Sequence, residues 1–170
     1  MNIRLASLND LEQILMIVRQ AQKWLEENNI NQWQNGYPNK ETIEKDLDAG
    51  YCHVAEADGK IIATVSLVVE PDINYSEIFD GKWLAENKYI SIHRIAVEES
   101  CKNTGAASQI IDFAQKFAKS KSCTSLRVDT HEDNIVMQKF LLKNNFTYCG
   151  IIYLQDKAKR LAYEKVLTDD

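Results

Sequence analysis

The sequence has few residues that interrupt or cross-link a chain. Its 170 residues include only 6 glycines and 2 prolines, with no repeat or low-complexity stretch, so flexible linkers have little room. The four cysteines are widely separated and form no CxxC pair, which favours free thiols over a disulfide framework. The three histidines also lack the spacing of metal ligands. The sequence therefore predicts one domain over residues 1–170 that holds no metal.

No stretch of the sequence concentrates charge of one sign, and none is a long apolar run. The chain has 20 basic and 25 acidic residues, a net charge of -5, and no basic run of the kind that binds nucleic acid. Its first residues lack the apolar core of a signal peptide, and its apolar runs are far shorter than the roughly 20 residues that span a bilayer. These absences predict a cytoplasmic protein without nucleic-acid or membrane partners.

The first half of the chain contains the patterns of strands and helices in turn. Residues 3–6 are typical of a short strand, and apolar residues then recur at helical spacing over 11–25. Asn39 is placed to cap a second helix, and Gly50 to end it in a left-handed conformation. Asp58–Gly59 is a strong turn signal between two strand-like runs, which predicts a hairpin.

The second half continues the alternation. "KYISIHRIAVE" is β-branched and alternating, and an apolar helical face begins after Gly105. "SLRVDT" is a further strand, Thr130 and Asp133 fit a capping box for the next helix, and two strands close the chain. The predicted order is β-α-α-β-β-β-α-β-α-β-β, a mixed α/β or α+β domain.

The stretch "CKNTGAASQII" joins a predicted strand to a helix and could bind an anion. Several free backbone N–H groups and the helix dipole meet at such a place, and small residues let phosphate oxygens approach. The absence of GK[ST] excludes a Walker loop, and the absence of GxGxxG a dinucleotide fingerprint. Taken alone, the stretch is better interpreted as an alanine-rich helix start packed against a sheet.

The wider pattern is more specific. "HRIAVEESCKNTGAASQIIDFAQKFAK", followed by "LRVDTHEDNIVMQKFLLKNNF", resembles the GNAT superfamily of acetyl-CoA-dependent N-acetyltransferases. The resemblance covers nearly the whole chain and is densest from His93 to Phe146. It implies a single GNAT-type domain with a mostly antiparallel, twisted central sheet of six to seven strands flanked by about four helices. It also implies acetyl-CoA as co-substrate and no metal.

The resemblance assigns cofactor contacts to a strand end, a loop and one later residue. The family loop [QR]-x-x-G-x-[GA] begins here at Lys102, where Gln or Arg is usual, so the positive charge is kept without the guanidinium fork. The residues that would bind coenzyme A are Ile95, Ala96, Val97, Lys102, Asn103, Thr104, Gly105, Ala106, Ala107 and Asn134. By side chain alone, the Ile95–Val97 triplet is also typical of a protein core, and Asn134 of a helix start.

Acetyl transfer to an amine needs a base, and it benefits from an acid. His93 is the candidate base, because some members of the family that this chain resembles use a histidine at this place to relay the proton of the amine. Alternation along the strand puts His93 on one face with Ser91, Ile95 and Val97, and the unperturbed histidine side chain titrates near neutral pH. By the same resemblance, the backbone N–H of Ile95 would stabilise the developing oxyanion. A structural hydrogen bond is the alternative role of His93. Relatives often use a tyrosine as the acid, at a position where this chain has Leu141.

The resemblance predicts transfer of an acetyl group from acetyl-CoA to a primary amine of a small molecule or peptide by direct attack. The alternative is a catalytically idle acyl-CoA-binding or sensing module of the same fold, which Leu141 and the altered loop favour. The acceptor is left open, and so is pairing into a homodimer. Candidates for the walls of the acceptor site are Trp24, Trp33, Tyr37, Tyr75, Phe79 and Trp83, with charge from Glu70, Asp72 or Glu77.

Overall fold

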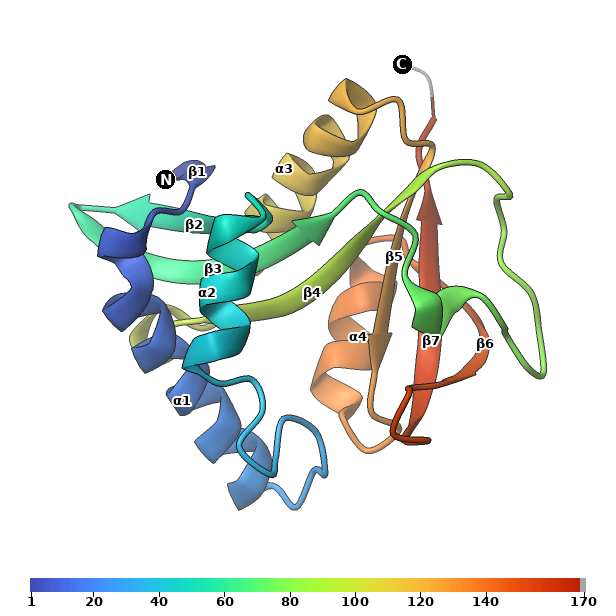
Figure 1. Ribbon diagram of the computed structural model, residues 1–170, viewed down its shortest axis with the longest axis horizontal. Helices are drawn as coiled ribbons and strands as arrows, with labels where there is room; N and C mark the ends of the chain where they lie inside the picture. Colours follow the sequence, from blue (N-terminus) through green and yellow to red (C-terminus); the bar gives the residue numbers. More distant parts are fainter. Residues whose placement is uncertain (169–170) are drawn as a thin grey trace. The chain divides into compact units, whose positions relative to one another are not determined.

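Residues 1–168 are described by a computed structural model, and their helices and strands follow the predicted order (Figure 1). The elements are β1 (Asn2–Leu5), α1 (Leu11–Glu27), α2 (Lys40–Asp48), β2 (Cys52–Ala57), β3 (Lys60–Val68), β4 (Tyr89–Val97), α3 (Ala106–Ser120), β5 (Ser125–Thr130), α4 (Ile135–Lys143), β6 (Thr147–Tyr153) and β7 (Lys159–Val166). Three short 3-10 helices accompany them: η1 (Leu8–Asp10), η2 (Ile73–Tyr75) and η3 (Glu99–Cys101).

The seven strands of residues 1–168 form one sheet in the order β1-β2-β3-β4-β5-β7-β6. The β1–β2, β2–β3, β5–β7 and β6–β7 pairs are antiparallel, whereas β4 and β5 are parallel. The predicted mixed α/β fold, with six to seven mostly antiparallel strands and about four helices, is confirmed.

The contacts within the chain define two units. The first contains residues 1–67 and 93–113, and the second contains residues 68–92 and 114 onward. β4 therefore begins in the second unit and ends in the first, and α3 begins in the first and ends in the second. A single domain over residues 1–170 stays a prediction.

The core of the first unit lies beneath α1. This helix buries a continuous apolar stripe, because its apolar residues recur every three or four positions. The stripe packs with residues of α2, β2, β3 and β4; the buried members of this cluster are Ala6, Leu11, Ile14, Leu15, Ile17, Val18, Ile43, Cys52, Val54, Ile61 and Ala96. The predicted hairpin is confirmed, since Asp58 (φ +50°) and Gly59 (φ +73°) both take the left-handed conformation of a tight turn between β2 and β3.

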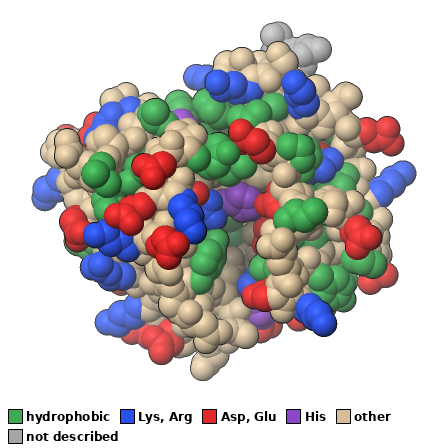
Figure 2. Space-filling view, in the orientation of Figure 1, with side chains coloured by type: hydrophobic (Ala, Val, Ile, Leu, Met, Phe, Trp, Pro, Cys, Tyr) green, Lys and Arg blue, Asp and Glu red, His purple; other side chains and the backbone are tan. Residues whose placement is uncertain are grey.

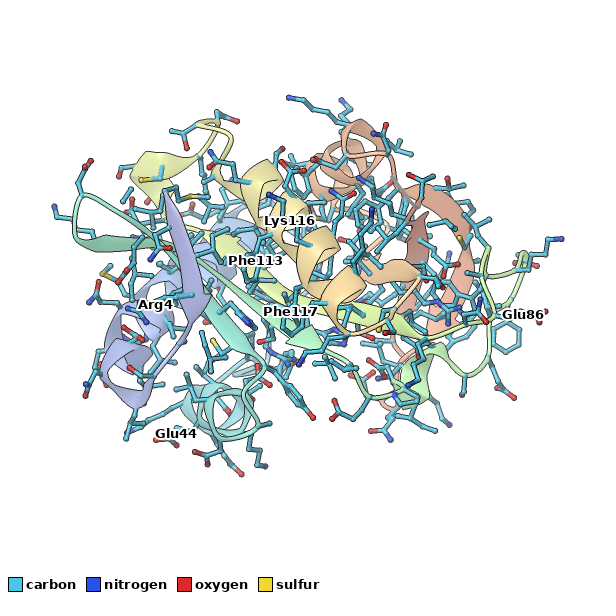
Figure 3. All side chains as sticks on the ribbon, turned by 90° about the horizontal axis from the view of Figure 1, so that it is seen from above. Arg4, Glu44, Glu86, Phe113, Lys116 and Phe117 are labelled. Atoms are coloured by element: carbon cyan, nitrogen blue, oxygen red, sulfur yellow. The ribbon has the colours of Figure 1, made fainter. Side chains whose placement is uncertain are left out.

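Polar residues fix the ends of the elements in this unit. Asn39 caps α2 by accepting a hydrogen bond from the Thr42 backbone N–H (2.9 Å), as predicted. Arg4 of β1, labelled in Figure 3, binds both carboxylate oxygens of Asp10 at 2.8 and 2.9 Å and reaches Glu56 at 2.6 Å. The Arg4 hydrogen bond lowers the pKa of Asp10 to about 2, so this carboxylate stays charged well into acid.

The second unit contains a buried ion pair that holds part of the long segment between β3 and β4. Arg127 of β5 pairs with Glu164 of β7, and Ser125 also donates to the Glu164 carboxylate at 2.6 Å. The same carboxylate accepts the backbone N–H of Ala85 at 3.3 Å, and the Arg127 Nη2 donates to the Ala85 carbonyl at 2.6 Å. The ring of Trp83 lies beneath the Arg127 guanidinium, 4.2 Å from ring centre to Cζ.

A second part of that segment meets β6. Phe79 and Ile151 exchange two backbone hydrogen bonds of 2.8 Å, which forms an isolated antiparallel bridge. Two glycines allow this close approach: a Cβ on Gly81 would lie 1.9 Å from the Cys149 carbonyl oxygen, and one on Gly150 would lie 2.5 Å from the Phe79 carbonyl oxygen. No larger residue fits at either position without displacing the backbone.

The start of α4 differs from the prediction. Asn134 caps the helix, with its side-chain oxygen accepting from the Met137 backbone N–H at 3.1 Å, so the predicted Thr130–Asp133 capping box is wrong. The pattern in the sequence fits both caps, but α4 begins only at Ile135. At the other end Asn145 adopts φ +63°, a conformation that asparagine tolerates better than most residues and that a glycine would enter freely.

Candidate active site

The last residues of β4 carry the predicted catalytic and acyl-binding positions of the first unit. His93, Ile95 and Val97 are half-buried, and Ala96 is buried in the core beneath α1. Arg94 has φ +52°, so it is in the left-handed region within a strand. A residue in this conformation interrupts the pleat, and the predicted simple alternation from Ser91 to Val97 is therefore wrong.

All three nitrogens of the Arg94 guanidinium donate hydrogen bonds. Its Nε and Nη2 donate to the two carboxylate oxygens of Asp46 at 2.6 and 2.8 Å, and its Nη1 donates to the Tyr37 hydroxyl at 2.9 Å. Asp46 also accepts from the Ser66 hydroxyl at 2.6 Å. The side chains of Arg94 and Asp46 are 13% and 8% exposed, so this is a nearly buried ion pair with a two-pronged geometry.

The connection from β4 to α3 is tied to α1. Gln20 of α1 accepts the backbone N–H of Glu99 at 3.0 Å and donates to the Glu98 carboxylate at 3.3 Å. One helical turn further, the Lys102 ammonium lies 5.4 Å from the centre of the Trp24 ring. A cation over an aromatic face is attracted by the ring quadrupole, so Trp24 helps to place this positive charge.

The start of α3 leaves a run of backbone donors open. Lys102 N–H donates to the Glu99 carbonyl at 3.3 Å, but no acceptor within residues 1–168 meets the N–H groups of residues 103–108. Asn103 (φ +64°) and Gly105 (φ +89°) are both left-handed, and a Cβ built on Gly105 would have no neighbour within 4 Å. Within residues 1–168, the first turn of α3 contains no acidic side chain. The open backbone N–H groups and the helix dipole therefore favour an anion at this place.

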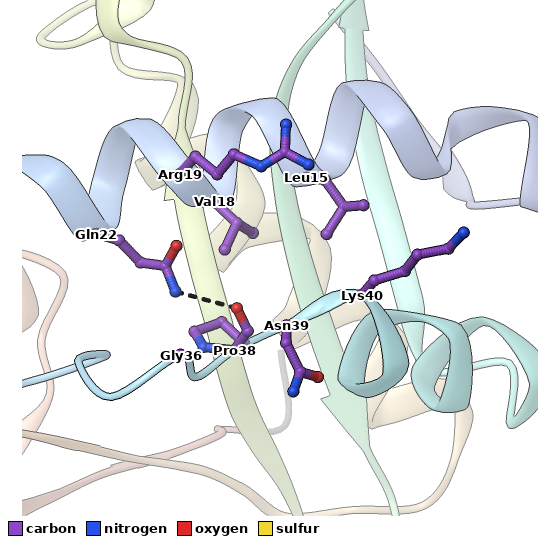
Figure 4. A pocket seen from close by; sticks show the side chains of 8 residues that line it. All are labelled: Leu15, Val18, Arg19, Gln22, Gly36, Pro38, Asn39 and Lys40. Carbon is purple, nitrogen blue, oxygen red and sulfur yellow. Dashed lines mark hydrogen bonds between the residues drawn. The ribbon is translucent and has the colours of Figure 1, made fainter.

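A pocket of about 240 Å³ lies between α1 and the segment that leads into α2 (Figure 4). Leu15 and Val18 of α1 form its apolar side, and Gln22 bridges it by donating to the Pro38 carbonyl at 3.0 Å. The complete lining is Leu15, Val18, Arg19, Gln22, Gly36, Pro38, Asn39 and Lys40. Tyr37, whose hydroxyl binds Arg94, lies in the chain between two of these residues.

His53, Cys52 and Cys149 have structural surroundings. His53 is 4% exposed, its Nδ1 lies 2.8 Å from the Tyr51 carbonyl oxygen, and its ring lies 5.4 Å from that of Phe113, a residue labelled on α3 in Figure 3. Burial lowers the pKa of His53, which keeps the imidazole neutral. Burial also raises the pKa of the Cys52 and Cys149 thiols to about 11, so neither is an activated nucleophile.

The predicted acceptor-site aromatics are divided between two roles. Tyr75 is 2% exposed in the core of the second unit, where its carbonyl accepts from the Trp83 indole at 3.0 Å, so it is not an open wall. Its hydroxyl lies 2.8 Å from Asp129, and burial raises the pKa of this phenol well above its usual range. Trp33 packs against the core of the first unit. Of the predicted set, Tyr37 is the one whose two chain neighbours, Gly36 and Pro38, line the pocket.

The predicted cofactor residues fall in both units. The strand end from Ile95 to Val97 and the loop from Lys102 to Ala107 belong to the first unit, whereas Asn134, 7% exposed, belongs to the second. Sequence reasoning missed Arg94, Asp46 and Gln20. A positive φ inside a strand has no signature in a single sequence, and the partners of Arg94 lie 48 and 57 residues away.

The surface shows no single-sign field on the face drawn in Figure 2, where basic and acidic side chains are interspersed. None of the helices in residues 1–168 has both the length and the apolar composition needed to cross a bilayer. Within the same residues, no group of three or more His, Cys, Asp or Glu side chains is arranged to hold a metal ion.

Comparison with known proteins defines the class. The model of the acetyltransferase (GNAT) family matches residues 18–146, and this chain belongs to that family. Among solved structures it is similar to a GNAT-family acetyltransferase from Streptococcus agalactiae 2603, with 32% identity, a TM-score of 0.89, and 99% of this chain and 96% of that chain covered.

More distant structures share the fold. A GNAT-family acetyltransferase from Listeria monocytogenes 4b F2365 is 22% identical with a TM-score of 0.76, covering 98% of this chain and 94% of that chain. The PaiA N-acetyltransferase from Thermoplasma acidophilum, solved in complex with coenzyme A, is 20% identical with a TM-score of 0.72, and 98% of both chains is covered. No curated protein matches the chain.

Proposed function

We propose that the protein transfers an acetyl group from acetyl-CoA to a primary amine of a small molecule or peptide, by direct attack of the amine. The observation that carries this proposal is the run of six backbone N–H groups, residues 103–108, that has no acceptor within the described chain. Membership of an acetyltransferase family and the coenzyme A bound to the similar Thermoplasma protein support the same cofactor.

The pyrophosphate of coenzyme A fits this run chemically. It presents several anionic oxygens, each of which accepts hydrogen bonds from amide N–H groups. Gly105 leaves open space where any side chain would stand, so the phosphates can reach the backbone of Ala106 and Ala107. The Lys102 ammonium, held near Trp24, adds a positive charge at the edge of the loop. Ile95, Ala96 and Val97 offer the extended backbone along which the pantetheine amides would pair. A contact at Asn134, which belongs to the second unit, stays a prediction from the sequence.

Acetyl-CoA supplies an activated thioester, and the chain's own residues do the rest. His93 takes the proton that the ammonium form of the acceptor must lose before it can attack. The backbone N–H of Ile95 donates a hydrogen bond to the acyl oxygen as negative charge develops there. The pocket beside Tyr37 receives the acceptor, with an apolar side from Leu15 and Val18.

Calorimetric titration of the purified chain with acetyl-CoA, desulfo-CoA and ATP tests the proposal. Binding of acetyl-CoA without binding of ATP is expected, since the loop lacks the GK[ST] residues of a Walker site and ATP has no pantetheine arm. A screen of primary amines, followed by release of free thiol, then tests transfer. Binding of acetyl-CoA without turnover of any amine would instead identify an acyl-CoA sensor, and absence of binding would overturn the proposal.

A further inference from the structure

Arg94 is the only non-glycine residue with a left-handed backbone inside a strand of residues 1–168. The other non-glycine residues with positive φ lie in turns, loops or helix ends. Arginine gains nothing locally from this backbone, because its Cβ makes the left-handed region unfavourable. Such a conformation persists only where the surrounding structure enforces it.

The enforcing contacts come from three other elements of the same unit. Asp46 on α2 engages two nitrogens of the Arg94 guanidinium, and Ser66 on β3 holds the Asp46 carboxylate in turn. Tyr37, in the segment before α2, engages the third nitrogen. The planar fork fixes the direction of the side chain as well as its position, which a lysine could not do.

The two neighbours of Arg94 in the chain are the proposed base and the proposed oxyanion donor. The orientation of the Ile95 N–H depends on the torsion angles of residue 94, because the peptide plane between residues 94 and 95 turns with them. The interrupted pleat also sets the angle between His93 and Ile95. Any relaxation of residue 94 to an ordinary strand conformation would therefore turn the Ile95 N–H away from its present direction.

We propose that Arg94 is a positioning residue: its ion pair with Asp46 holds the left-handed backbone that directs the Ile95 N–H, and its bond to Tyr37 ties that backbone to the acceptor pocket. The inference rests on the proposed function. It separates two tasks within the first unit. The loop at residues 103–108 binds the pyrophosphate of the cofactor without help from Arg94, whereas the rate of transfer depends on the Arg94–Asp46 pair.

Three variants test this separation. Arg94→Lys keeps the charge but loses the fork, Asp46→Asn weakens the anchor, and Tyr37→Phe removes only the link to the pocket. We expect kcat to fall about 10–100-fold in Arg94→Lys and Asp46→Asn, as for a small displacement of a reacting group. The Kd of acetyl-CoA should change less than threefold. Tyr37→Phe should mainly raise the KM of the amine.

Arg4→Lys is the matched control, because Arg4 makes a similar two-pronged pair with Asp10 in the same unit, away from β4. It should lower stability while kcat per folded molecule stays unchanged. All rates are therefore normalised to the folded fraction measured by circular dichroism. A folded Arg94→Lys variant with the wild-type kcat overturns the inference, as does a loss of kcat that Arg4→Lys reproduces.

A spectroscopic measurement distinguishes failure of the inference from failure of the proposed function. In ¹⁵N-labelled protein, Asp46→Asn, which leaves the sequence around residue 94 unchanged, should shift the amide resonances of His93 and Ile95 and leave those of residues 103–108 in place. If wild-type protein acetylates no amine, the proposed function fails, while these resonances still decide whether Arg94 holds the backbone. Unshifted His93 and Ile95 resonances overturn the inference whatever the activity.

Discussion

Arg127 and Glu164 form an ion pair inside the second unit, with 2.9 Å between Nε and Oε1 and side-chain exposures of 6% and 0%. The pair is fully engaged: Ser125 and the Ala85 N–H also bind the carboxylate, and the rings of Trp83 and Tyr89 lie 4.2 and 4.0 Å from the guanidinium carbon. Two neighbouring strands and the segment before β4 therefore share one electrostatic contact.

Removing one partner of this pair should destabilise the protein strongly. Glu164→Ala leaves a buried guanidinium without its counter-charge, which costs about 3–5 kcal/mol of unfolding free energy. Urea denaturation measures the loss. Lys159→Ala is the control, since the exposed Lys159–Glu132 pair should contribute little. A small effect of Glu164→Ala would mean that water reaches Arg127 and replaces the carboxylate.

Gly81→Ala should also destabilise the fold. The new Cβ would lie 1.9 Å from the Cys149 carbonyl oxygen, and this neighbour is backbone that cannot turn aside. We expect a loss of about 1–3 kcal/mol, measured as a shift of the urea midpoint at constant slope. Gly59→Ala provides a contrast, because it meets open space and bears only the cost of a left-handed alanine. Equal losses in the two variants would contradict close packing at Gly81.

Gly105→Glu should abolish binding of acetyl-CoA. The side chain would place a carboxylate among the open N–H groups of α3, where it competes with the pyrophosphate and repels it. Gly105→Ala shares the left-handed backbone at φ +89° without the charge, so it isolates the electrostatic part. Calorimetry should show a much larger loss for glutamate than for alanine. Unchanged affinity in Gly105→Glu would refute the loop assignment.

His93→Ala should remove the acidic limb of the pH profile. A general base acts in its deprotonated form, so activity that depends on one falls in acid, where the base is protonated. Without the imidazole, kcat should drop at neutral pH and lose this dependence on pH. His131→Ala is the control, since His131 interacts with Asp133 in the second unit instead. A folded His93→Ala variant with an unaltered profile would return His93 to a structural role.

Asp10 should contribute stability that is lost in acid. Its pKa falls from 3.8 to about 2 in the folded chain, because Arg4 binds the ionised form. The contribution, about 2 kcal/mol from this shift, is fully present above the unfolded pKa and is lost as the pH falls from about 4 towards 2. The difference in urea stability between wild type and Asp10→Asn should therefore shrink over that range. A difference independent of pH would rule out the ion pair as its source.

Local sequence signals predicted most of the elements. The turn at Asp58–Gly59 and the cap at Asn39 depend on neighbours within a few residues, and a sequence displays those directly. The start of α4 was predicted wrongly because Thr130, Asp133 and Asn134 all suit a cap, and only the tertiary path of the chain decides among them. The loop from Lys102 to Ala107 could be proposed from the sequence because its pattern lies in small neighbouring residues rather than in distant partners, and its role as a cofactor site stays a prediction.

The arrangement around the candidate site was less accessible from the sequence. The left-handed Arg94 depends on Asp46 and Tyr37, and pairings of this range leave no local pattern. Leu141 is a residue that the sequence did reveal, and the structure explains it. Its side chain is fully buried in α4, so leucine at the position where relatives often carry tyrosine is a core residue of this chain. In the proposed reaction, a different group would therefore have to donate a proton to the leaving thiolate where one is needed.

The bridge between Phe79 and Ile151 bears on how copies of the chain can assemble. β6 is the last strand in the sheet order, and terminal strands are where a second sheet would add by backbone pairing. Phe79 already occupies both hydrogen-bonding groups of Ile151. A partner strand can therefore pair with β6 at this point only after residues 78–81 have moved away. Gly81 and Gly150, which let this segment lie so close to β6, thus also help to keep other strands from pairing with β6.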